Sequence, residues 1–186
     1  MVPDRGTQLW LRVLASATKM DKPTIDQDEY LDLVDENDNV IGKKKRSEVY
    51  AEHLSNFRVV NAFVVNSKGE IWIPRRTANK RIFPLCLDIS MGGHVESGES
   101  YENMLKRETQ EELNIDIDKI PYRLLDHLTP QKDNVSAHMN VYEIKMDETP
   151  DYNKTTLPKE RIFMIRHSPF LKKSPIKFII FDKRDS

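Results

Sequence analysis

Residues 93–115 read GHVESGESYENMLKRETQEELNI, and this stretch decides the fold that we expect. Five of its charged residues stand at fixed distances from Gly93. They are Glu99, Arg107, Glu108, Glu111 and Glu112. No glycine or proline interrupts Tyr101–Leu113, and Ser100 in front of it is a good helix-capping residue. The stretch therefore predicts a loop that leads into a helix over residues 101–113.

The predicted helix has an apolar side and an acidic side. A seam that can pack against a sheet recurs every four residues, at Tyr101, Leu105, Thr109 and Leu113. Glu108, Glu111 and Glu112 share one face because they stand at i, i+3 and i+4. Three carboxylates within one turn repel one another, and a hard divalent cation such as Mg²⁺ would relieve that repulsion. Taken alone, these glutamates could instead be a solvated acidic face.

The spacing of these residues resembles the Nudix box, G-x5-E-x7-R-E-U-x-E-E-x-G-U with U aliphatic, which is the signature of the Nudix hydrolases. Thr109 stands where an aliphatic residue is usual, and Asn114 stands where glycine is usual. Thr109 can still pack with its hydroxyl bonded back to a carbonyl. Asn114 tolerates the left-handed conformation at a helix end. The resemblance implies a metal-dependent hydrolase that cleaves a diphosphate bond, in a nucleoside diphosphate linked to another moiety or in a similar compound.

The resemblance also implies a role for each residue of the box. The expected catalytic residues are Glu99, Arg107, Glu108 and Glu111. Arg107 is expected to pair with Glu99 and so tie the loop to the helix, although a simple i,i+4 pair with Glu111 is the alternative. Mg²⁺, or Mn²⁺ in its place, could bridge phosphate oxygens and lower the pKa of a bound water. The expected metal ligands are the Gly92 carbonyl, Glu108, Glu111 and Glu112.

Segments outside the box are similar to the isopentenyl-diphosphate-isomerase-like branch of the Nudix superfamily. They read DLVDENDNVIG, VVNSKGEIWIPRRTANKRIFP and LDISMGGHVESGES, and the likeness covers roughly residues 28–146. True isomerases carry a catalytic cysteine two residues before the histidine of this loop. Here the loop reads Gly92-Gly93-His94, and Cys86 lies six residues before Gly92. Hydrolysis is therefore favoured, with an isopentenyl-diphosphate isomerase and a catalytically silent nucleotide-binding sensor as the alternatives.

Members of that branch contact diphosphate through the stretch that reads RRTANK here. The expected substrate-binding residues are Arg75, Arg76, Lys80 and His94. Arginine can pair with phosphate in a bidentate manner, and lysine acts as a point charge. For the three cations the alternative is a solvated strand end and loop. For His94 it is a loop histidine that touches neither substrate nor metal.

A length of 186 residues fits one domain of ordinary size. We expect an α/β fold, a Nudix-type α/β/α sandwich with a mixed sheet. The domain is expected to span residues 25–186, with its motif-bearing core at 28–146, after a non-catalytic N-terminal extension at 1–24. Strands are expected at 30–35, 39–43, 58–65, 71–73, 87–90, 122–128 and 139–146, with a short helix from Ser47 to His53.

The last forty residues show no clean amphipathic period, and Pro169 and Pro175 interrupt them. We therefore expect an atypical C-terminal closure of the sandwich. The KFIIF segment at 177–181 is typical of a strand. The tail could pair on a sheet edge or reach a second subunit, which leaves a homodimer as one alternative.

Composition excludes several classes of protein. A net charge of −1 argues against a general nucleic-acid binder. No apolar run approaches the length of a membrane span. The single cysteine, Cys86, excludes an intrachain disulfide and suits a reducing compartment. We therefore expect a cytoplasmic protein that acts on a small-molecule diphosphate without nucleic-acid or membrane partners.

Overall fold

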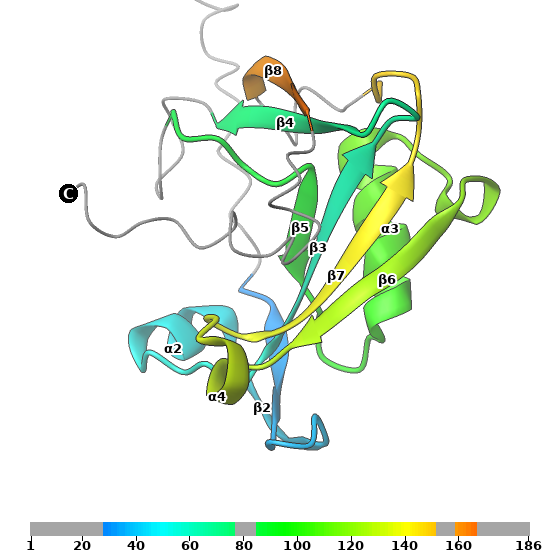
Figure 1. The fold of residues 1–186 in the computed structure, drawn as a ribbon. Helices are drawn as coiled ribbons and strands as arrows, with labels where there is room; N and C mark the ends of the chain where they lie inside the picture. The colour runs from blue at the N-terminus through cyan, green and yellow to red at the C-terminus, as the bar shows by residue number, and fades with distance from the viewer. Residues whose placement is uncertain (1–27, 77–84, 152–158, 167–186) are drawn as a thin grey trace, which may run out of the picture.

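The computed structural model describes residues 28–76, 85–151 and 159–166 (Figure 1). Its elements in chain order are β1 Tyr30–Val34, β2 Val40–Lys45, α2 Arg46–Ala51, β3 Arg58–Val65, β4 Glu70–Arg76, β5 Met91–His94, α3 Tyr101–Leu113, a 3₁₀ turn Ile117–Lys119, β6 Tyr122–Leu128, α4 Pro130–Asp133, β7 His138–Lys145 and β8 Lys159–Arg166. Within these ranges, no helix is long and apolar enough to cross a membrane.

A mixed six-stranded sheet is the centre of the fold, as the α/β reading predicts. Its strands run in the order β6-β7-β3-β4-β8, and β5 pairs with β3 off this path. The β3–β7 pair is parallel, and the other pairs are antiparallel. β3 is buried along most of its length because it has neighbours on both sides and its run of Val, Ala and Phe suits a central strand.

β3 has two different partners along one of its edges. β4 pairs only with the last two residues of β3, Val64 and Val65. β5 takes the same edge further down, where Val59 to Ala62 lie opposite His94 to Met91. The divergence of β4 therefore opens the place in the sheet that β5 fills. This brings the Gly92-Gly93-His94 stretch between β3 and α3.

α3 matches the predicted helix at both ends. Ser100 Oγ accepts a hydrogen bond from the Asn103 amide at 3.1 Å, and Asn114 closes the helix with φ of 54°. Thr109 is fully buried and donates its hydroxyl to the Leu105 carbonyl at 2.7 Å, as expected. Its methyl group packs, so the departure from an aliphatic residue costs the helix little.

The apolar seam of α3 packs on one face of the sheet, and Figure 1 shows the helix behind β3, β7 and β6. Leu105, Leu113 and the unpredicted Met104 are fully buried there, whereas Tyr101 is only partly buried. They lie in one cluster with side chains of the strands: Val60, Ala62, Val64, Trp72, Met91, Tyr142 and Ile144. Burial of these apolar side chains fixes α3 on the sheet, and this sets the position of its acidic face relative to β5.

The β1–β2 hairpin fastens the loop that precedes α3. Asp32 on β1 accepts hydrogen bonds from the Ser97 hydroxyl at 2.7 Å and the Gly98 amide at 2.9 Å. The Ser97 amide donates to the Tyr30 carbonyl at 2.7 Å. Gly98 has φ of 84°, a conformation that favours glycine. The β1–β2 hairpin therefore supports the loop before α3, although the two segments lie far apart in the sequence.

Two local predictions need correction. The strand predicted at 87–90 lies at Met91–His94 instead, and Leu87 makes only an isolated bridge to Arg75. The short helix begins at Arg46 and not after Ser47, because the Glu48 carboxylate accepts the Lys45 amide while Ser47 donates to Asp28.

The chain after residue 146 forms a strand that we did not predict. β8 pairs antiparallel with β4, from Glu70 opposite Arg166 to Arg76 opposite Lys159. This stretch of the tail therefore lies on a sheet edge, as one of the two alternatives proposed. The N-terminal extension at 1–24, the KFIIF segment and the remainder of the C-terminal closure lie outside the described residues.

His138 at the start of β7 predicts that the stability of the fold decreases in acid. Its side chain is fully buried, and neither ring nitrogen has a hydrogen-bond partner within the described chain. Burial lowers the pKa of His138, as do the charges of His127 and Arg58, while Asp38 and Asp35 oppose them. The unfolded chain therefore takes up this proton at a higher pH than the folded chain does.

We expect the free energy of unfolding to decrease as pH drops below about 6.5, the ordinary pKa of histidine. A single proton contributes a slope of at most about 1.4 kcal/mol per pH unit. Urea unfolding between pH 7.5 and 5 measures the slope. His138→Gln should flatten it, whereas His53→Asn at an exposed position should not. An equal slope in the parent and His138→Gln would contradict the assignment.

Candidate active site

Arg107 is the centre of the acidic side of α3. Its guanidinium donates Nε to Glu99 Oε1 and Nη2 to Glu99 Oε2, both at 3.0 Å. Its Nη1 donates to Glu108 Oε1 at 2.7 Å and lies 3.8 Å from Glu111 Oε2. A further bond of 3.3 Å joins Nη2 to the His94 carbonyl. The expected pairing of Arg107 with Glu99 is present, and it is bidentate, which fixes both side chains in one plane.

Glu108 lies beneath this guanidinium and is largely removed from water. Its side chain is 16% exposed, against 56% for Glu111 one turn later. Burial raises the pKa of Glu108, Arg107 lowers it, and the charges of Glu111 and Glu29 raise it further. The carboxylate thus stands where negative charge is costly, so an additional cation at this place would be favourable.

Gly93 makes the approach of Glu108 to β5 feasible. A Cβ at Gly93 would lie 2.9 Å from Glu108 Oε1 and 3.0 Å from Met104 Cε. Gly92 is enclosed more tightly, since its Cβ would lie 2.3 Å from Ile89 Cδ1, 2.7 Å from Asn61 Oδ1 and 3.1 Å from the Val60 carbonyl oxygen. The two glycines therefore serve close packing between β3 and α3.

Gly92→Ala is expected to destabilise the protein by about 1–3 kcal/mol, the usual cost of overpacking. The Val60 carbonyl belongs to a central strand and cannot move away, so the strain must shift β5 itself. Gly42→Ala is the matched control, because no atom lies within 4 Å of a Cβ at Gly42. Thermal melts of both variants decide the point. Equal melting temperatures for the two variants would show that position 92 has room.

His94 is held by aromatic side chains from outside the box. Its Nε2 forms a 2.8 Å hydrogen bond with the Tyr50 hydroxyl of α2. Its ring stacks on Phe57, with centroids 5.8 Å apart and planes at 23°. Sequence reasoning missed Tyr50 and Phe57, because neither belongs to a motif and only the packing of α2 on the sheet brings them here.

Comparison with known proteins places this geometry in a family. The model of the NUDIX domain matches residues 55–172. An uncharacterized Nudix hydrolase of Nostoc is 66% identical over 126 residues, which cover 68% of this chain and 75% of the relative. A Nudix hydrolase of Deinococcus radiodurans is 48% identical over 126 residues, or 68% of this chain and 73% of the relative.

This chain belongs to the Nudix hydrolases. A crystal structure of the protein DR0079 from Deinococcus radiodurans shares the fold, with a TM-score of 0.67 and 42% identity over 74% of this chain and 83% of that one. The superfamily and the α/β fold expected from residues 93–115 are therefore confirmed. The isomerase-like branch is not established by these likenesses.

Nudix hydrolases generally use divalent metals, and the acidic face of α3 suits one. Glu108, Glu111 and Glu112 offer the carboxylate oxygens that Mg²⁺ prefers, and the buried charge of Glu108 lacks full compensation. Among the described residues, no group of three or more His, Cys, Asp or Glu side chains has the geometry to hold a metal ion. Arg107 lies 2.7 Å from Glu108 and 3.8 Å from Glu111 on this face. The metal-ligand set stays a prediction.

The expected substrate cations of the Nudix hydrolase are only partly described. Arg75 on β4 donates Nη1 to the Leu85 carbonyl at 2.6 Å. Arg76 is described only as the last residue of β4, and Lys80 lies outside the described residues. Substrate binding by these three residues stays a prediction.

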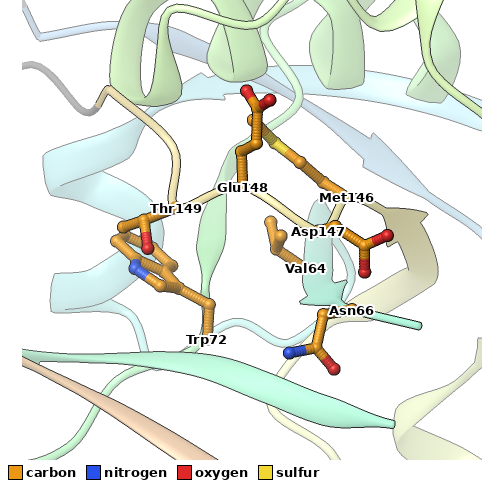
Figure 2. A pocket seen from close by; sticks show the side chains of 7 residues that line it. All are labelled: Val64, Asn66, Trp72, Met146, Asp147, Glu148 and Thr149. Carbon is orange, nitrogen blue, oxygen red and sulfur yellow. The ribbon is translucent and has the colours of Figure 1, made fainter. Parts of the chain in front are cut away.

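One depression of the surface lies away from the box and is not a candidate active site. Figure 2 shows its lining, which comes from the end of β3, from β4 and from residues 146–149. Its cavity volume is about 10 Å³, roughly the room of one water molecule and far below the several hundred Å³ usual for small-molecule sites. None of its residues belongs to the box or carries a group that the box needs.

Proposed function

We propose that this Nudix hydrolase cleaves the diphosphate bond of a nucleoside diphosphate linked to another moiety, or of a similar compound, with Mg²⁺ as its metal and Mn²⁺ as a substitute. One observation carries the proposal: Arg107 joins Glu99 to Glu108, and a Cβ at Gly93 would lie only 2.9 Å from Glu108 Oε1. This arrangement gathers two carboxylates of low exposure, 15% for Glu99 and 16% for Glu108, and it sets Glu108 against the glycine-bearing strand β5.

Each residue of the box then has a task that follows from its position. Glu108, Glu111 and Glu112, with the Gly92 carbonyl, would hold the metal, which would neutralise diphosphate charge and acidify a bound water. Arg107 positions Glu99 and Glu108 through its hydrogen bonds to both carboxylates. Glu99 is 15% exposed and oriented by two hydrogen bonds, so it is our candidate for assisting the base. Substrate contacts are proposed at Arg75, Arg76, Lys80 and His94.

The packing of Gly92 also supports hydrolysis over isomerisation. An isomerase of this superfamily branch needs a cysteine at this position, and here the neighbouring Ile89, Asn61 and Val60 leave no room for a side chain. We therefore expect no interconversion of isopentenyl and dimethylallyl diphosphate. A mass-spectrometric assay of both compounds measures it. Isomerisation that Cys86→Ala abolishes would reverse the assignment.

The proposed activity is tested by a screen of nucleoside diphosphates linked to sugars, alcohols or a second nucleotide. Released nucleotide or phosphate is measured with Mg²⁺, with Mn²⁺ and with a chelator. At least one compound should be hydrolysed, and only with metal present. Binding without turnover across the whole screen would favour the silent sensor instead.

The proposal also covers the organisation of the chain. We propose that residues 25–186 form one domain around the motif-bearing core at 28–146, with 1–24 as a non-catalytic extension, and that the protein works in the cytoplasm. Cys86 is a free, partly buried thiol, which agrees with a reducing compartment. A homodimer remains the alternative to a monomer.

A further inference from the structure

Asp32 on β1 is a buried carboxylate that is bonded to the loop of the box. Its side chain belongs to a residue that is 8% exposed. Its Oδ1 accepts the Ser97 hydroxyl at 2.7 Å, and its Oδ2 accepts the Gly98 amide at 2.9 Å. A carboxylate that leaves water loses hydration, and hydrogen bonds to its charge compensate for that loss. Asp32 therefore binds firmly to the two residues that stand directly before Glu99.

The backbone of this loop is fastened to β1 at a second place. The Ser97 amide donates to the Tyr30 carbonyl at 2.7 Å, and Glu96 forms an isolated bridge with β1. Gly98 then turns with φ of 84°, and no atom lies within 4 Å of a Cβ at this position. Because the space around this Cβ is open, side-chain packing does not hold the turn. The bond from its amide to Asp32 does.

The carboxylate of Glu99 is held from two sides, and one of these sides is the loop. Its Oε2 accepts the Glu96 amide at 3.1 Å, and its own amide donates to the Glu96 carbonyl at 2.9 Å. From α3, Arg107 donates two bonds of 3.0 Å. Arg107 thus fixes the carboxylate, whereas residues 96–98 fix the backbone from which it extends. A shift of this backbone would move Glu99 relative to Arg107.

We propose that Asp32 is a positioning residue of the active site, which holds Glu99 in place through Ser97 and Gly98. The inference rests on the proposed function, because it assumes that Glu99 has a task in turnover. Asp32 touches neither substrate nor metal and acts only through Glu99. A displacement of about 1 Å in such a group can cost about 100-fold in rate. The substrate contacts that we propose lie on other residues, so loss of Asp32 should lower kcat and leave KM nearly unchanged.

Three variants of the full chain separate positioning from support of the fold. Asp32→Ala loses both bonds and should lower kcat at least about ten-fold, with KM within about two-fold of the parent. Asp32→Asn should keep kcat within about three-fold, because its Oδ1 can accept the Gly98 amide and its Nδ2 can donate to the Ser97 hydroxyl. Asp35→Ala is the matched control, since Asp35 accepts two backbone amides in the turn of the same hairpin. It should lower the melting temperature without lowering kcat.

A double-mutant cycle with Glu99→Gln shows through which group Asp32 acts. Turnover is measured at saturating Mg²⁺, well below each melting temperature, on the screened compound that the parent hydrolyses fastest. In the Glu99→Gln background, Asp32→Ala should lower kcat by less than about two-fold, because the function that Asp32 supports is already lost. Full multiplication of the two single effects would overturn the proposal. A kcat of Asp32→Asn or Asp35→Ala as low as that of Asp32→Ala would overturn it as well.

Amide hydrogen exchange tests the same contacts without turnover. In Asp32→Ala, the amides of Glu96 and Gly98 should exchange at least about ten-fold faster, whereas the amide of Val60 in the central strand should not change. Unchanged exchange at both loop amides would overturn the proposal, whatever the kinetics show. A parent that hydrolyses no compound of the screen would remove the proposed function. Faster exchange at Glu96 and Gly98 would then still support the positioning of Glu99 by Asp32.

Discussion

Arg107→Met is expected to lower both turnover and stability, because it removes the guanidinium that joins Glu99 to Glu108. Glu99 and Glu108 are 15% and 16% exposed, so both would be left facing each other with little solvent. Breaking a fully buried pair costs about 3–5 kcal/mol. Partial exposure reduces this to about 2–3 kcal/mol, or a melting temperature lower by roughly 5–10 °C at this chain length.

The turnover of Arg107→Met should fall by about 100-fold or more, since Glu99 loses both bonds that orient it. Lys106→Met is the matched control, because Lys106 pairs with Asp118 where both side chains are exposed. Its melting temperature should stay within about 2 °C of the parent. Thermal melts at pH 7 and pH 5 add a sharper test, because protonated carboxylates no longer repel. A loss of stability in Arg107→Met that does not diminish at pH 5 would contradict this account.

Glu112→Gln is expected to lose most turnover, on the order of 100-fold, while the fold stays intact. The change removes one charge from the proposed metal site and keeps the size of the side chain. The buried seam of α3 is untouched, because it lies on Met104, Leu105, Thr109 and Leu113. Melting temperature and kcat measured across Mg²⁺ concentrations separate the two effects.

The apparent Mg²⁺ affinity of Glu112→Gln should decrease together with kcat. Glu102→Gln is its control, since Glu102 is an exposed carboxylate in the first turn of the same helix. Near-parental activity of Glu112→Gln at limiting Mg²⁺ would show that Glu112 is not a ligand. Glu102→Gln should keep near-parental activity at limiting Mg²⁺, because the charge of Glu102 lies outside the proposed metal site.

Residues 93–115 alone were sufficient to predict the helix, its caps and its most important ion pair. The reason is that all of these are local interactions. Ser100 caps the amide three residues later, Thr109 bonds back one turn, and Arg107 reaches Glu99 across a short loop. A helix also converts sequence spacing directly into a shared face. The superfamily followed from the same spacing.

Interactions between distant segments could not be read in this way. The strand before the box was placed four residues too early, because β3 pairs with Met91–His94, whereas Leu87 makes only an isolated bridge to Arg75. β8 was not predicted, since its strand character depends on pairing with β4. Strand propensity reflects such neighbours more than the chain itself.

The sequence by itself determined which carboxylates and which arginine belong to the box, because their mutual positions follow from helical geometry and a short loop. Only the tertiary structure decided that Gly92 has no space for a side chain, that Glu108 is buried and Glu111 is not, and that Tyr50 and Phe57 stand beside His94. These properties depend on atoms contributed by β3, α2 and β5, and a fold must close before such segments can exclude water or meet one another.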